Sequence, residues 1–123
     1  MPKRLLVVED DLSLRRLYCA EFEDDGYAVR SVGSGEAALD EVAVSPPDVV
    51  VLDVHLPGAN GLETLRTLLE RHPEMRVVLN SAYPGYKADF ASWSADGYVV
   101  KSSDLSELKA AVAGATGRGA RAA

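Results

Sequence analysis

The run Val49-Val50-Val51-Leu52-Asp53 constrains the fold of this chain more than any other stretch. Four apolar residues stand in a row, three of them β-branched, and such a run is typical of a strand buried on both faces. Strands of this kind belong to parallel sheets with helices on either side. The run ends on the carboxylate of Asp53, and Pro57 and Gly61 then indicate a loop. Open α/β sheets bind their ligands at this position, beyond the carboxyl ends of the strands.

Further short apolar runs alternate with helical patterns along the chain. The patterns that indicate strands cover Arg4–Val8, Tyr27–Val32, Met75–Leu79 and Tyr98–Val100. Apolar residues at helical spacing follow each strand: Leu14, Leu17, Tyr18 and Phe22; Ala38, Leu39 and Val42; Leu62, Leu65, Leu68 and Leu69; Tyr86, Phe90 and Trp93; Leu105, Leu108, Ala111 and Val112. The order βαβαβαβαβα predicts an α/β fold: a doubly wound, five-stranded parallel sheet with helices on both faces.

Polar residues and glycines mark the expected ends of these helices. Asp10 or Asp11 would begin the first helix and Ser34 the second, because their side chains can accept the free backbone N–H groups there. Gly26 would end the first helix. Asp104, followed by Glu107 three residues later, resembles a capping box at the start of the last helix.

Length and charge limit the organisation and the partners of the chain. Its 123 residues suffice for one domain. We expect this domain to cover residues 1–114, with a flexible tail at 115–123, because the stretch GATGRGARAA contains no large apolar residue. The net charge of −6 argues against direct binding of nucleic acid, which needs a basic face.

The sequence also gives no sign of export or of a membrane. No apolar run is long enough to span a bilayer, and the start of the chain lacks the pattern of a signal peptide. Cys19 is the only cysteine, so neither an internal disulfide nor a cysteine metal cluster is expected. Together these features favour a cytoplasmic protein.

Charged and polar residues follow four of the predicted strands. They are Glu9 and Asp10, then Asp53, Ser81 and Lys101. If the strands adopt the flavodoxin-like order 2-1-3-4-5, all five side chains share one cleft. Three carboxylates there need a counter-charge, and Mg²⁺ fits best because it accepts few protein oxygens and keeps room for a phosphoryl oxygen. A carboxylate nucleophile, a metal ion, a lysine and a hydroxyl are the parts needed to accept a phosphoryl group.

With these residues at its strand ends, the chain resembles a response-regulator receiver domain, the phosphoacceptor module of two-component signalling. The matching motifs are Val7-Val8-Glu9-Asp10, Leu52-Asp53 with Pro57 and Gly61 behind it, Ser81-Ala82, and Tyr98-Val99-Val100-Lys101. They occur in the family's order and span residues 4 to 113. The run Lys101–Leu105 is similar to that of single-domain receivers.

The resemblance implies roles for the acidic residues. Asp53 matches the phosphorylated aspartate. Glu9 and Asp10 match the acidic pair that holds Mg²⁺ together with Asp53, with Asp10 as the more direct ligand of the pair. The backbone carbonyl of His55 matches the remaining protein ligand. The chain would thus be no enzyme acting on a separate substrate, but a phosphoacceptor that assists its own phosphorylation and dephosphorylation.

The resemblance also implies how the signal passes on. Ser81 matches the hydroxyl that binds the phosphoryl group in the active state, Lys101 the lysine that pairs with it, and Tyr98 the aromatic switch residue. Ser102 follows Lys101 where the family usually has proline. The implied partners are a histidine kinase or phosphotransfer protein, and a downstream protein that binds the face of the fourth helix, fifth strand and fifth helix. Neither nucleic acid nor a membrane is implied, and the domain would be a monomer or a phosphorylation-dependent dimer.

The same residues also allow roles outside phosphoryl transfer. Glu9 and Asp10 could serve only to cap a helix, Ser81 could be a turn residue, and Tyr98 could be an ordinary strand aromatic. The run Gly33–Ala38 fits a nucleotide-binding fingerprint, but the acids of the neighbouring cleft would repel a pyrophosphate. An aspartate-nucleophile phosphatase would have a second aspartate at position 55. The main alternative is a receiver-like binding module that signals without phosphorylation.

Overall fold

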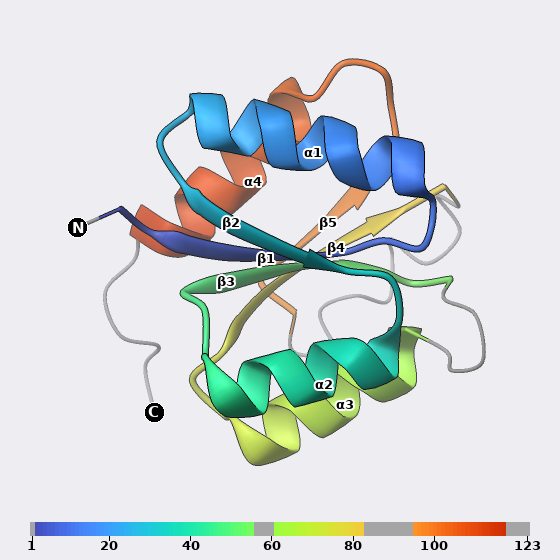
Figure 1. The fold of residues 1–123 in the computed structure, drawn as a ribbon, viewed down its shortest axis with the longest axis vertical. Helices are drawn as coiled ribbons and strands as arrows, with labels where there is room; N and C mark the ends of the chain where they lie inside the picture. The colour runs from blue at the N-terminus through green and yellow to red at the C-terminus, as the bar shows by residue number, and fades with distance from the viewer. Residues whose placement is uncertain (1, 56–60, 83–94, 118–123) are drawn as a thin grey trace.

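The computed structural model describes residues 2–55, 61–82 and 95–117, which form one parallel sheet and four helices (Figure 1). The strands are β1 (Arg4–Val8), β2 (Ala28–Val32), β3 (Val49–Asp53), β4 (Arg76–Ser81) and β5 (Gly97–Val100). The helices are α1 (Leu12–Asp24), α2 (Gly35–Val44), α3 (Gly61–Arg71) and α4 (Ser106–Gly117). The strand predictions are confirmed to within two residues at each end.

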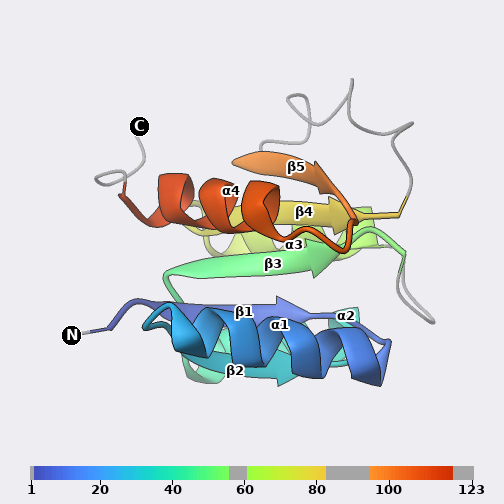
Figure 2. The same ribbon diagram turned by 90° about the horizontal axis from the view of Figure 1, so that it is seen from above.

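The sheet has the predicted order β2-β1-β3-β4-β5, and all neighbouring strands are parallel. All five carboxyl ends therefore lie at one edge of the sheet (Figure 2). Helices α1 and α4 cover one face, while α2 and α3 cover the other (Figure 1). Every residue of β3 is buried, as expected for the central strand of a sheet that is covered twice.

Two apolar clusters fill the space between the sheet and its two helix layers. The α1–α4 cluster contains Tyr18 and Phe22 from α1, Leu108 and Val112 from α4, and strand residues such as Val51. The α2–α3 cluster takes the alternate strand residues, among them Val50, Leu52 and Tyr98. Because strand side chains alternate between the two faces, the central strands contribute to both clusters.

Both ends of α1 and the start of α2 follow the sequence signals. The Asp11 side chain accepts a hydrogen bond from the N–H of Leu14, and the Ser34 side chain accepts one from Ala37, so both residues are N-caps. Gly26 has φ +97°, and its N–H donates to the carbonyl of Glu23. This left-handed conformation suits glycine and turns the chain from α1 into β2.

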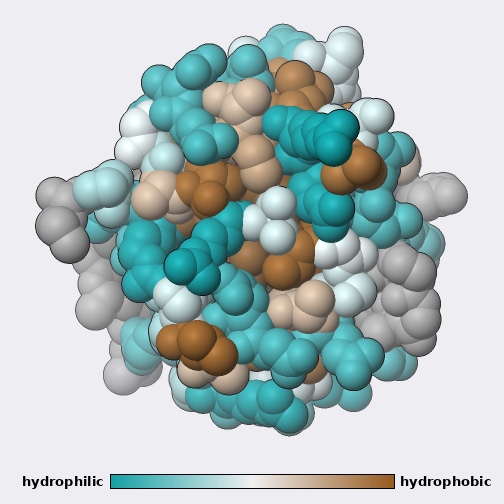
Figure 3. Space-filling model, in the orientation of Figure 1, coloured by the Kyte–Doolittle hydropathy of each residue, from teal (hydrophilic) through white to brown (hydrophobic). Residues whose placement is uncertain are grey.

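Strand β2 is an edge strand, as predicted. Its residues Ala28, Arg30 and Ser31 are exposed, while Val29 and Val32 are half-buried. The surface over β2, toward the viewer in Figure 3, accordingly mixes hydrophilic and hydrophobic residues. Among the described helices, none has the length and apolar character that a membrane span requires.

Two details of the sequence-based prediction are wrong. Leu17 belongs to the predicted buried stripe of α1 but is 44% exposed, because the buried line runs through Tyr18 and Phe22, four residues apart. The domain boundary at residue 114 falls inside α4, which continues to Gly117 and buries Ala115. A small side chain is enough to pack there.

Two predicted segments lie outside the described residues. They are the helix with Tyr86, Phe90 and Trp93 and the tail beyond residue 117.

Candidate phosphoacceptor site

Strand alternation brings four polar side chains to one face of the sheet. Residues Val7, Val51, Val78 and Val99 all belong to the α1–α4 cluster. The residues two positions later therefore point to the same face at the carboxyl edge, and these are Glu9, Asp53, Asn80 and Lys101. Glu9, Asp53 and Asn80 are buried, at 2%, 4% and 2% exposure.

Lys101 joins two of the carboxylates. Its Nζ lies 2.7 Å from Glu9 Oε1 and 3.0 Å from Asp53 Oδ2. The other oxygen of Asp53, Oδ1, accepts a hydrogen bond of 3.0 Å from the backbone N–H of His55. Asp53 is thus fixed through both oxygens, and Lys101 lies beside it although Ser102 follows in place of proline.

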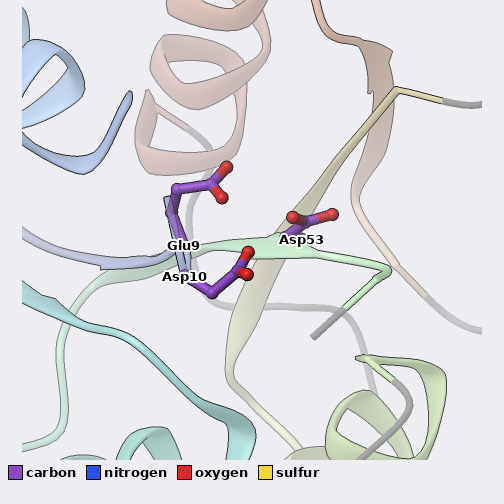
Figure 4. A group of neighbouring side chains, drawn as sticks. All are labelled: Glu9, Asp10 and Asp53. Atoms are coloured by element: carbon purple, nitrogen blue, oxygen red, sulfur yellow. The ribbon is translucent and has the colours of Figure 1, made fainter. Parts of the chain in front are cut away.

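The acidic cluster also has the composition of a cation site. Carboxylate oxygens of Glu9, Asp10 and Asp53 lie within 4.8 Å of one another, at the ends of β1 and β3 (Figure 4). Glu9 Oε2 accepts a hydrogen bond from the N–H of Asp11. Glu9 Oε1 is buried, and the ammonium of Lys101 lies 2.7 Å from it. Three carboxylates so close together carry more negative charge than Lys101 alone can balance, and such a set of oxygens fits a hard cation such as Mg²⁺.

Burial and the neighbouring charges act in opposite directions on the pKa values of Glu9 and Lys101. Burial raises the pKa of Glu9 above its ordinary 4.5, and the contacts with Lys101 and the Asp11 N–H only partly offset this. Burial lowers the pKa of Lys101, but its contacts with Glu9 and Asp53 outweigh that effect and raise the pKa above 10.5. Lys101 is therefore a cation at neutral pH and holds the two carboxylates together.

The remaining predicted site residues lie nearby in different environments. His55 is exposed and follows β3 by two residues, and its carbonyl as a metal ligand stays a prediction. Ser81 ends β4 and is fully buried. Tyr98 is 5% exposed and belongs to the α2–α3 cluster, so its ring faces inward, and its role as a switch also stays a prediction.

Sequence reasoning missed one buried polar contact next to the site. The side-chain N–H of Asn80 donates a 3.1 Å hydrogen bond to the Tyr18 hydroxyl. Asn80 pairs with Asp53 in the register of β3 and β4. The only signal in the sequence is an amide directly after the apolar run Val77–Leu79, and Tyr18 has the spacing of an ordinary member of a helical stripe.

Comparison with known proteins gives a consistent result for the family. The family model described as the response regulator receiver domain matches residues 5–113. Response regulator MprA of Mycolicibacterium vanbaalenii is 36% identical over 112 residues, which cover 89% of this chain and 48% of MprA. The chain thus spans about half the length of this curated relative.

Solved structures agree with the sequence comparison. Response regulator protein TrrA of Thermotoga maritima, in complex with Mg²⁺-BeF, is 37% identical, with a TM-score of 0.87 over 92% of this chain and 98% of TrrA. TrrA in complex with the histidine kinase ThkA matches with a TM-score of 0.85 at 37% identity, over 92% of this chain and 97% of that one. The match of the family model across nearly the whole chain, on a sheet with the predicted strand order, shows that this chain belongs to the response regulator receiver domain family.

Proposed function

We propose that this domain accepts a phosphoryl group on Asp53 from the phosphohistidine of a histidine kinase or phosphotransfer protein. The observation that carries the proposal is the setting of Asp53: a buried carboxylate at a strand end, fixed by Lys101 and the His55 N–H, and adjacent to Glu9 and Asp10. The complexes of TrrA with Mg²⁺-BeF and with a histidine kinase support the same function.

The chemistry would be a direct phosphoryl transfer. A carboxylate oxygen of Asp53 forms the new O–P bond while the P–N bond to the donor histidine breaks, and the electron pair of that bond stays on the histidine nitrogen. The contacts to both oxygens hold the Asp53 carboxylate in one orientation, which lowers the entropic cost of reaching the transition state. Lys101 places positive charge where the phosphoryl oxygens become more negative.

Glu9, Asp10 and Asp53, with the backbone carbonyl of His55, would hold Mg²⁺. When bound, the ion supplies positive charge that neutralises the carboxylates and the phosphoryl oxygens. The three carboxylates within 4.8 Å of one another, whose charge Lys101 balances only in part, support this assignment.

We further propose that phosphorylation switches the output face. Ser81 and Lys101 would bind the phosphoryl group, and Tyr98 would change its packing as the population shifts between two states. The partner surface would consist of β5, α4 and the predicted helix around Phe90, which lies outside the described residues. The domain would act in the cytoplasm as a phosphoacceptor and not as an enzyme on a separate substrate.

A direct test is intact-protein mass spectrometry after incubation with Mg²⁺ and acetyl phosphate. The wild-type protein should gain the mass of one phosphoryl group, and Asp53→Asn should gain none. Asp40→Asn, the same change at an exposed position of α2, should behave like wild type. The absence of a mass gain in the wild-type protein would favour the alternative of a receiver-like module that binds partners without phosphorylation.

A further inference from the structure

A buried polar pair lies between the apolar core and the charged residues of the site. Tyr18 is 2% exposed and belongs to the α1–α4 cluster together with Phe22 and Val51. Its hydroxyl accepts the hydrogen bond from Asn80, which is itself 2% exposed. Two apolar side chains would fill this space without the cost of removing polar groups from water. Packing alone therefore does not account for the pair.

The position of Asn80 links the pair to Asp53. The two residues are register partners on neighbouring parallel strands, so their backbones are about 4.8 Å apart. Both side chains point to the α1–α4 face by strand alternation. A fixed Asn80 side chain therefore limits the orientations that the Asp53 carboxylate can adopt beside it. Tyr18 fixes Asn80 in turn, from a helix that begins directly after the acidic residues.

The charged residues of the site influence the pKa of the Tyr18 hydroxyl. Burial is the largest influence and raises the pKa of Tyr18, the hydrogen bond from Asn80 and the charge of Lys101 lower it, and Glu9 and Asp53 raise it. The net effect is a rise above the ordinary value of 10.0, so the phenol stays neutral at physiological pH. Tyr18 thus adds a dipole beside the site and no further negative charge.

We infer that Tyr18 and Asn80 are positioning residues that hold the Asp53 carboxylate in the orientation needed for phosphoryl transfer. Neither is assigned a contact with the phosphoryl group, because the Asn80 side chain donates to Tyr18 and Tyr18 packs in the α1–α4 cluster. The inference rests on the proposed function. It assigns the pair a kinetic role in addition to any contribution to stability.

The test measures the rate of phosphorylation by acetyl phosphate at saturating Mg²⁺, well below the melting temperature. The variants are Tyr18→Phe, Asn80→Leu and the double variant. Tyr18→Phe keeps the ring and removes only the hydroxyl. Tyr27→Phe is the matched control, because Tyr27 packs edge-on against Phe22 and precedes β2 at the amino-terminal edge of the sheet. Circular dichroism verifies that each variant is folded.

Each single variant should slow phosphorylation roughly fivefold, the factor typical of one lost hydrogen bond, and Tyr27→Phe should match wild type. The double variant should be no slower than the slower single variant, because both changes break the same contact.

A merely structural role would lower the melting temperature and leave these rates unchanged, which would overturn the inference while the proposed function stands. Additive effects would overturn the pairing. If Asn80→Leu does not fold, Tyr18→Phe alone decides. An unphosphorylated wild-type protein would refute the proposed function and the inference together.

Discussion

Replacing Lys101 by methionine should destabilise the domain far more than replacing an ordinary surface lysine. Within the described residues, Lys101 is the only cation that contacts Glu9 and Asp53. Its side chain is 18% exposed, and the two carboxylate side chains are 2% and 5% exposed. Removing one partner of a buried ion pair typically costs about 3–5 kcal/mol. Because Lys101 keeps some solvent contact, we expect about 3 kcal/mol at pH 7 without Mg²⁺.

The pH dependence of this loss follows from Glu9. Its pKa in the folded protein is raised above the ordinary 4.5, and removing Lys101 would raise it further. A carboxyl with a raised pKa binds its proton more tightly in the folded state, so stability is lost as the pH rises from 4.5 through the folded pKa. The difference between Lys101→Met and wild type should therefore shrink as the pH falls toward 4.5.

Urea unfolding at pH 7 and pH 5, in the presence of EDTA, measures both effects. Lys109→Met is the matched control. Lys109 Nζ lies 3.0 Å from Glu21 and 3.3 Å from Asp25, but its side chain is 31% exposed and those of both partners are 40% exposed, so its loss should have a much smaller effect. If the two variants are equally stable, or if the loss at Lys101 is the same at both pH values, the argument from a buried charge cluster is wrong.

Three further substitutions test the site and its support. Asp10→Asn should weaken Mg²⁺ binding at least tenfold in calorimetric titration, because it removes an exposed carboxylate from the cation cluster; unchanged affinity would mean that Asp10 only supports the start of α1. Gly61→Ala should cost about 2 kcal/mol in urea unfolding and slow phosphorylation, since an added Cβ would lie 2.2 Å from the carbonyl oxygen of Asp53. Gly114→Ala, with nothing within 4 Å, should instead stabilise α4 by about 0.5–1 kcal/mol; equal effects of the two alanines would contradict the steric argument.

The main elements of the site could be predicted because they depend on local patterns and on one topological rule. The apolar run before Asp53 indicates a central strand without reference to any other part of the chain. Glu9, Asp10 and Lys101 follow similar runs, and parallel strands bring their ends to the same edge. A strand order could then be chosen in which these side chains meet, and the structure has that order.

The Tyr18–Asn80 contact could not be predicted in the same way. It depends on the register between β3 and β4 and on how α1 lies across the sheet, and neither leaves a local signal. Leu17 shows the same limit on a smaller scale. Its spacing from Leu14 suits a buried stripe, but the packing of α1 buries Tyr18 instead. Tertiary packing thus decides between neighbouring positions on a helix.

The central claim is that Asp53 is the phosphoryl acceptor, and chemical trapping tests it most directly. An aspartyl phosphate is reduced by borohydride to homoserine, so the protein can be phosphorylated with Mg²⁺ and acetyl phosphate, reduced, digested and mapped by peptide mass spectrometry. We predict conversion of Asp53 to homoserine, dependent on Mg²⁺, with Asp10 and Glu9 unchanged. Conversion at either of those residues, or none at Asp53 in protein that carries phosphate, would contradict the account.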